Sequence, residues 1–208
     1  MENYRPDEEE VLQEMRRVRR SDRRHRTGWS LLFFIVLAVA AGWFLSNRYF
    51  TLAEVRGAGM DDTLKSGNLV LCRRVGAEEK PRQGDLVLYS HGNDWQIKRV
   101  IALGGDRVVV SAEGEVRVNG DVLAEDYVTG SALDAGLQAR RVNLNESELF
   151  VMGDHRGLSV DSRNADFGVI RDEDVIGIAR YVVWPFYQIG ELKRPAMPAQ
   201  PTDSGVTP

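Results

Sequence analysis

The chain has 208 residues, of which 43% are hydrophobic, and its formal net charge is −4. This composition allows a folded core, and the acidic balance gives no reason to expect a nucleic-acid partner. The single cysteine, Cys72, excludes an internal disulfide, and the three histidines lie too far apart in the sequence to indicate a metal site.

Residues 1–28 form a highly charged segment, which we predict to be a cytoplasmic tail. Its arginines crowd just before the apolar segment that follows, at Arg16, Arg17, Arg19, Arg20, Arg23, Arg24 and Arg26. Positive charge beside a membrane span is retained on the cytoplasmic side. The cluster therefore indicates topology, and binding to anionic lipid headgroups is a second interpretation.

Residues 29–46 are predicted to form one transmembrane helix, because no charged residue occurs from Trp29 to Leu45. Such a helix is about 26 Å long at about 1.5 Å per residue, close to the hydrocarbon thickness of a bilayer. A soluble core helix is seldom apolar on every face. A cleavable signal peptide has a shorter leader and small residues at its exit. We therefore expect a retained single span, with residues 47–208 on the outer side.

Residues 47–193 are predicted to form a mainly β domain, a barrel or a sandwich. Asn119-Gly120-Asp121 is typical of a tight hairpin turn. A polar insertion is expected at about residues 120–147, and the proline-containing residues 194–208 are expected to be a disordered tail. Short runs rich in β-branched and aliphatic residues indicate strands at 69–72, 86–89, 96–103, 107–110, 116–118, 150–152 and 175–183.

Five features occur in order between residues 30 and 190. They are the apolar span, the segment at Gly59-Met60, Gly84-Asp85-Leu86-Val87, Lys98-Arg99-Val100-Ile101, and Gly153-Asp154 through Ser162-Arg163 with Gly168 after it. In this order and spacing the chain resembles the bacterial type I signal peptidases, membrane-bound Ser/Lys peptidases that remove signal peptides from exported proteins. The resemblance implies a signal-peptidase-like β domain outside the plasma membrane of a bacterium. It also implies signal peptides as partners and no cofactor.

The resemblance further implies roles for individual residues. Lys98 matches the general base, which must be a neutral amine to accept a proton. Ser159 matches a serine that hydrogen-bonds this lysine and holds it in place. Ion pairs between Arg99 and Asp154, and between Asp161 and Arg163, are expected to fix the loops around the site.

The position of the nucleophile departs from the family pattern. The family reads approximately Ser-Met-x-Pro-Thr-Leu-x-x-Gly-Asp, whereas this chain reads Gly59-Met60-Asp61-Asp62-Thr63-Leu64-Lys65-Ser66-Gly67-Asn68. Glycine has no side chain to attack a carbonyl, although its backbone N–H remains available to an oxyanion. We therefore expect a non-catalytic homologue that binds extended peptides or an assembly partner, with Met60 lining the peptide site. The alternative is an active signal peptidase with an atypical nucleophile.

Overall fold

The structure is a computed structural model that describes residues 9, 29–44, 47–61, 63–76, 79–92, 94–128 and 139–196. The arginine cluster, Asp62, residues 129–138 of the expected insertion and residues 197–208 therefore lie outside the described part. The chain divides into two units, residues 1–48 and residues 49–208, and each is described by itself.

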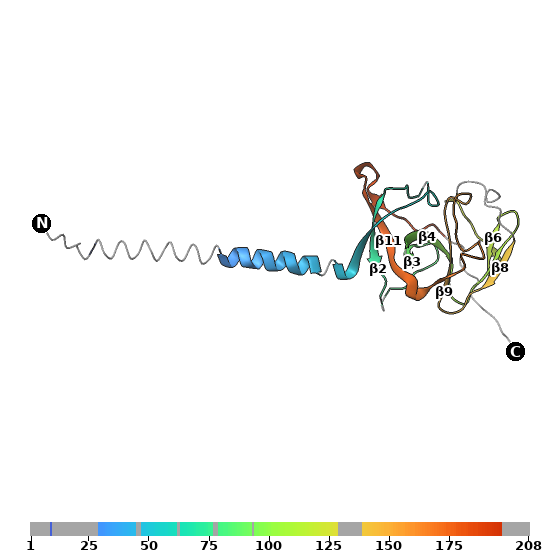
Figure 1. Cartoon of the computed structure of the whole chain (residues 1–208), viewed down its shortest axis with the longest axis horizontal. Helices are drawn as coiled ribbons and strands as arrows, with labels where there is room; N and C mark the ends of the chain where they lie inside the picture. The colour runs from blue at the N-terminus through green and yellow to red at the C-terminus, as the bar shows by residue number, and fades with distance from the viewer. Residues whose placement is uncertain are drawn as a thin grey trace. The chain divides into compact units, whose positions relative to one another are not determined.

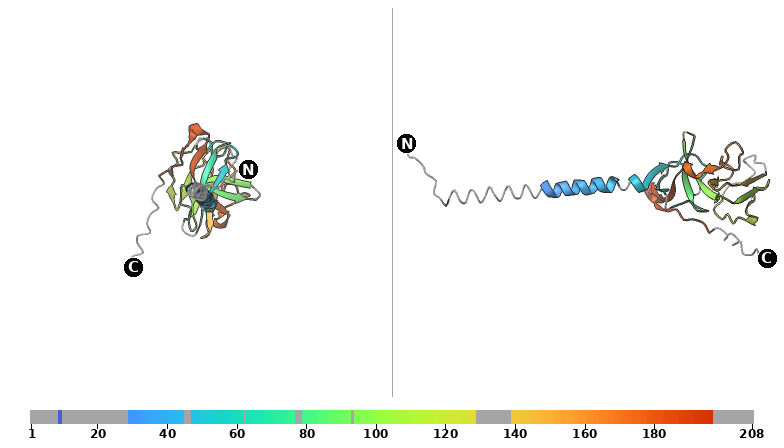
Figure 2. Two further views of the ribbon diagram at one scale, coloured as in Figure 1. Left: turned by 90° about the vertical axis from the view of Figure 1, so that its left-hand side faces the viewer. Right: turned by 90° about the horizontal axis from the view of Figure 1, so that it is seen from below.

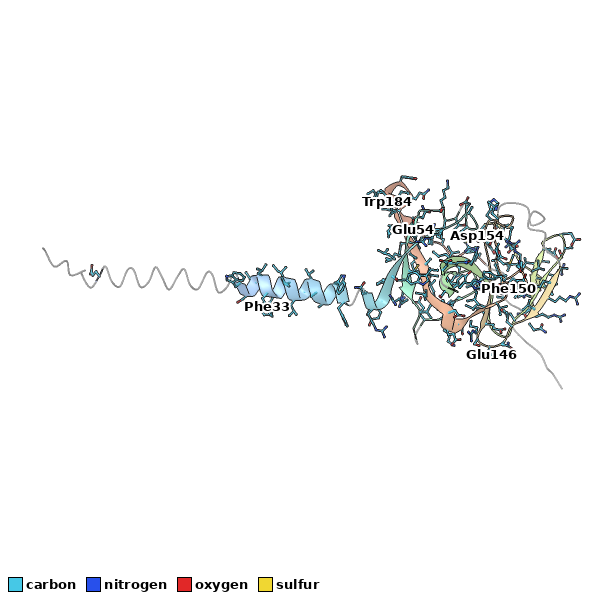
Figure 3. The ribbon with its side chains drawn as sticks, viewed as in Figure 1. Phe33, Glu54, Glu146, Phe150, Asp154 and Trp184 are labelled. Carbon is cyan, nitrogen blue, oxygen red and sulfur yellow. The ribbon has the colours of Figure 1, made fainter. Side chains whose placement is uncertain are left out.

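Most described residues of the first unit belong to one long apolar helix, Trp29–Tyr49, whose last residue is the first of the second unit. The described side chains of this helix are all exposed, and Phe33 points outward from it (Figure 3). The predicted N-terminal apolar helix is thus present, and its length and composition suit a membrane span.

The second unit is built on a large antiparallel sheet (Figure 1). Its strand order is β1 (Phe50–Glu54), β2 (Leu69–Arg74), β11 (Val175–Trp184), β3 (Leu86–His91), β4 (Asp94–Ala102), β9 (Glu148–Met152) and β10 (Ile170–Arg171). A further strand, β12 (Gly190–Glu191), pairs with β11. Short 3-10 helices, η2 (Asp172–Asp174) and η3 (Phe186–Gln188), flank β11.

A second, smaller sheet has the order β7 (Asp121–Val122), β6 (Val116–Val118), β5 (Arg107–Val110) and β8 (Arg140–Asn143). Strands β6 and β8 lie at the end of the β unit away from β2 (Figure 1), and the second view agrees (Figure 2, right). The predicted hairpin turn is confirmed: Asn119 and Gly120 both have positive φ, 56° and 101°, between the paired residues Val118 and Asp121.

The buried clusters explain the pattern of apolar residues along the strands. Leu86 and Leu88 of β3 join one buried cluster, while Val87 and Tyr89 join another, so both faces of this strand are covered. A third cluster joins the two sheets, because Phe150 and Met152 of β9 pack with valines of β5 and β6. Cys72 is fully buried in the core as expected, and burial raises the pKa of its thiol to about 12.

The mainly β prediction is confirmed, and each of the seven expected strands is present with small differences at its ends. The short or peripheral strands β1, β7, β8, β10 and β12 were not predicted. Two of them, β7 and β8, fall within the range expected to be a polar insertion. Their exposed polar residues belong to a small sheet that is covered on one face only. Because these polar residues are typical of loops, the range was predicted to be an insertion.

Phe150 is fully buried between the two sheets, so its truncation tests whether they share one core. We expect Phe150→Ala to lower the free energy of unfolding by about 3–5 kcal/mol, because it removes a large apolar side chain and leaves a cavity. Urea unfolding of the full chain in detergent measures this change. Leu158→Ala, at a side chain that is 59% exposed, is the control and should change stability little. Equal effects of the two substitutions would contradict the shared core.

Candidate functional site

The segment between β1 and β2 carries Gly59 and is fixed at both ends. The Val55 amide donates to the Asn68 carbonyl at 2.8 Å, and the Gly67 amide donates to the Val55 carbonyl at 2.9 Å. Met60 and Leu64 are buried in the core beneath the segment, and the Leu64 amide donates to the Met60 carbonyl at 2.7 Å. The backbone at Gly59 is therefore held by packing on one side of the turn.

Lys98 reaches Gly59 from β4. Pairing of Lys98 with Val87 of β3 places the lysine well inside the large sheet, where its side chain is 7% exposed. Its Nζ donates a hydrogen bond to Ser159 Oγ at 2.7 Å. A Cβ atom added at Gly59 would lie only 2.8 Å from this Nζ, so the amine occupies the space directly beside the glycine backbone.

The environment of Lys98 lowers the pKa of its amine below the usual value. Burial is the main cause, because a charged ammonium loses its hydration there. The nearby charge of Arg163 lowers the pKa further, whereas Asp161 and Asp154 oppose the shift. The net effect favours the neutral amine relative to an exposed lysine.

Asp161 organises the loop that carries Ser159. It accepts hydrogen bonds from the Gly153 amide at 2.9 Å and from Arg163 Nε at 2.8 Å. Arg163 also donates to the Ser159 carbonyl at 3.2 Å, which ties the serine backbone to the same ion pair. Burial alone would raise the pKa of Asp161, but the hydrogen bond and charge of Arg163 and the Gly153 amide overcome it and leave that pKa lowered.

Asp154, labelled in Figure 3, is the second buried carboxylate of the site. Arg99 Nε donates to its carboxylate at 2.8 Å, and Thr63 Oγ1 donates to it at 2.6 Å. Since Thr63 follows Gly59 along the chain, Asp154 links β4 to the glycine segment. Both predicted ion pairs, Arg99 with Asp154 and Asp161 with Arg163, are thus present and almost fully buried.

Gly153 allows the two loops to approach each other. A Cβ atom at this position would lie 2.3 Å from the Gly59 carbonyl oxygen and 2.3 Å from Ser159 Oγ, which no side chain tolerates. The His155 amide then donates to the Gly59 carbonyl at 3.1 Å. The backbone at Gly59 and the Ser159 loop are therefore in direct contact.

Two residues of the expected insertion reach this site, and sequence reasoning missed both. Glu125 forms an ion pair with the buried Arg156, whose Nε donates to the Gly153 carbonyl at 3.2 Å. Tyr127 lies under the guanidinium of Arg99, 4.3 Å from ring centroid to carbon, a cation–π contact. The segment that follows β7 therefore contacts the loops around Lys98.

A cleft of about 370 Å³ opens beside Gly59 and Lys98. Its lining comes from the chain around the end of β1, from the start of β4, and from two exposed apolar residues, Leu158 and Val160, on either side of Ser159. Met60 also lines the cleft, as expected, although most of its side chain is buried in the core. Ser159 itself is not among the lining residues.

The two backbone edges along this cleft are unpaired in the described part of the chain. Strand β1 pairs only with β2, and residues 94–98 of β4 pair only with β3, because β9 pairs with β4 from Arg99 onward. Free strand edges on both sides of a cleft suit an extended peptide, which can add as a strand. Within the described residues, no group of three or more acidic, cysteine or histidine side chains is arranged to hold a metal.

Comparison with known proteins gives consistent matches. A family model described as signal peptidase, peptidase S26, matches residues 26–184. Signal peptidase I of Bacillus licheniformis is 31% identical over 170 residues, which cover 77% of this chain and 88% of that protein. Signal peptidase IB of Staphylococcus aureus (strain COL) is 30% identical over 170 residues, covering 74% and 85%. A crystal structure of a signal peptidase I from Enterococcus faecalis V583 is 27% identical, covers 48% of this chain and 97% of its own, and aligns with a TM-score of 0.39.

The lowered pKa of Lys98 predicts a pH-dependent stability. Between its folded pKa and the unfolded value near 10.5, the unfolded chain binds the proton and the folded chain does not, so stability rises with pH. We expect Lys98→Met to remove this rise. The free energy of unfolding of Lys98→Met should exceed that of the parent most at pH values below the pKa of Lys98 in the folded chain. The difference should shrink as pH approaches 10.5. Urea unfolding across this pH range measures the difference.

Lys80→Met, at an exposed lysine, is the matched control and should give no such trend. A constant difference between Lys98→Met and the parent at every pH would contradict the buried, destabilised ammonium.

The contact of Glu125 with Arg156 predicts a second effect on stability. We expect Glu125→Gln to cost about 3–5 kcal/mol, because it leaves the Arg156 guanidinium buried without its counter-charge. Glu173→Gln is the control, since Glu173 pairs with Arg171 at the surface, where such pairs contribute about 0–1 kcal/mol. Urea unfolding measures the stability of both variants, and equal small effects would contradict a stabilising role for the segment that follows β7.

Proposed function

Since this chain belongs to the signal peptidase, peptidase S26, family, we propose that it is a membrane-anchored member that binds extended peptide segments of exported proteins without cutting them. The observation that carries this proposal is the geometry at Gly59. A lysine amine and its supporting serine meet there, and none of the described residues that line the cleft carries a hydroxyl group.

Other hydroxyl groups near the site are poorly placed to replace a nucleophile. Thr63 Oγ1 is bonded to Asp154, and Ser66 lies in an exposed turn. Ser159 Oγ is the nearest hydroxyl to the amine, at 2.7 Å, but Ser159 is buried and does not line the cleft. A docked carbonyl therefore approaches the Gly59 backbone and the lysine rather than any of these oxygens.

Peptide binding does not need the missing hydroxyl. The unpaired edges of β1 and of residues 94–98 offer backbone hydrogen bonds to a strand between them. Apolar side chains along the cleft, among them Val55, Ile97 and Val160, favour small apolar residues in the bound segment. Signal-peptide-bearing proteins supply such segments, so we propose them as the partners, together with a protein partner in surface assembly.

The remaining proposals concern the membrane. Residues 29–46 span the plasma membrane of a bacterium once, with residues 1–28 in the cytoplasm and residues 47–193 forming the outer domain. Of the tail expected from residue 194 onward, Arg194 pairs with the buried Asp85 at 2.8 Å, and residues 197–208 lie outside the described part. The long apolar helix and the membrane-anchored nature of the family support this arrangement.

The proposal predicts that the purified full chain in detergent does not process a preprotein. Loss of the nucleophile in a serine protease lowers kcat by about 10⁶-fold. We expect Gly59→Ser to restore partial cleavage. Rescue should be incomplete, because the added Cβ lies 2.8 Å from Lys98 Nζ and 3.3 Å from the Ser159 backbone, so the lysine must shift. Gel-based processing of a signal-peptide-bearing substrate measures the rates.

Gly59→Ala adds the same Cβ without the hydroxyl and is the matched control. Gly59→Ser combined with Lys98→Ala should also be inactive. Efficient processing by the unaltered chain would reject the proposal. Its acyl adduct, located by mass spectrometry, would then show whether Ser159, Thr63 or Ser66 is the atypical nucleophile.

A further inference from the structure

The position of the Lys98 amine has a consequence beyond peptide binding. Lys98 and Gly59 both line the cleft, and Nζ lies 2.8 Å from the point that a Cβ of residue 59 would occupy. A serine there would place its CH₂OH group next to the amine. With glycine, the described residues put no side chain between Nζ and a carbonyl group that lies along the Gly59 backbone.

We propose that Lys98 acts as an amine nucleophile, forming a reversible imine with aldehydes that enter this cleft. The chain has only four lysines, Lys65, Lys80, Lys98 and Lys193. Of these, Lys98 alone is buried at the cleft, and the other three are exposed. The environment that lowers its pKa also increases the share of neutral amine, the form that attacks a carbonyl.

The reaction balances without any other reagent. The nitrogen lone pair forms a bond to the carbonyl carbon, and the carbonyl oxygen takes a proton from the nitrogen to give a carbinolamine. The second N–H proton then leaves with the hydroxyl group as water, and the carbon–nitrogen double bond forms. Amine and aldehyde thus give imine and water, with no change of oxidation state, and water reverses the step.

The contact with Ser159 is compatible with this chemistry. Ser159 Oγ is 2.7 Å from Nζ and orients the amine, and Ser159 is not among the residues that line the cleft. The buried ion pair of Asp161 with Arg163 fixes the serine backbone. The amine is therefore held in one place, and orientation of this kind raises the rate of attack on a docked carbonyl.

The test treats the full chain in detergent with an aldehyde and sodium cyanoborohydride, which reduces an imine to a stable secondary amine. Two probes are used separately: propanal, and a short N-acetylated peptide that ends in alanine aldehyde. Peptide mapping by mass spectrometry then measures alkylation at each lysine and at the N-terminal amine. We expect at least about tenfold more adduct at Lys98 than at Lys65, Lys80 or Lys193, because only Lys98 is oriented at a cleft.

Three variants sharpen the result. Lys98→Met should lose the cleft adduct and keep the surface background. Gly59→Ser should lower the Lys98 adduct several-fold, because the added CH₂OH stands beside the amine and takes the aldehyde as a hemiacetal. Gly59→Ala separates the steric part of that effect from the hydroxyl.

The two probes distinguish this inference from the proposed peptide binding. Selective labelling by propanal but not by the peptide aldehyde supports the imine site and counts against the peptide groove. Selective labelling by the peptide aldehyde supports both. If neither probe labels Lys98 above the three exposed lysines, in a chain shown by circular dichroism to be folded, the inference is overturned.

Discussion

Burial of a single amine is the constraint on which the rest of the site depends. Lys98 stands on β4 and is 7% exposed, with its Nζ beside the Ser159 hydroxyl and the Gly59 backbone. Burying an ammonium is costly, so the site is stable only if the amine gives up its proton readily or finds partners. The hydrogen bond to Ser159 supplies such a partner without supplying a full counter-charge.

Two buried carboxylates hold the segments around the Lys98 amine in fixed positions. Asp161 ties the Ser159 loop to Gly153, and Asp154 ties β4 to the segment that carries Gly59. Each is neutralised by an arginine, so the nearby negative charge only partly opposes the lowered pKa of Lys98. Glu125 and Tyr127, in the segment that follows β7, add further contacts. The result is a buried and oriented amine beside a glycine.

Local sequence patterns were sufficient for the apolar helix, for the longer strands and for the Asn119-Gly120 turn, since each depends on neighbours within a few residues. The resemblance to a family predicted the hydrogen bond between Lys98 and Ser159. The two residues are 61 positions apart, so no local sequence pattern indicates this contact. Edge strands such as β1 were missed because their exposure weakens the alternation of apolar and polar residues in the sequence. Glu125 and Tyr127 were missed because their partners, Arg156 and Arg99, are distant in the sequence.

The ionisation of Lys98 itself is the most direct test of this account. Full-length chain carrying ¹³C,¹⁵N-labelled lysine can be titrated in detergent, and the four lysine side chains can be followed by NMR and assigned by substitution. The account predicts that Lys98 loses its proton at a clearly lower pH than the exposed Lys65, Lys80 and Lys193. Titration of all four lysines together, near the ordinary value of about 10.4, would contradict it.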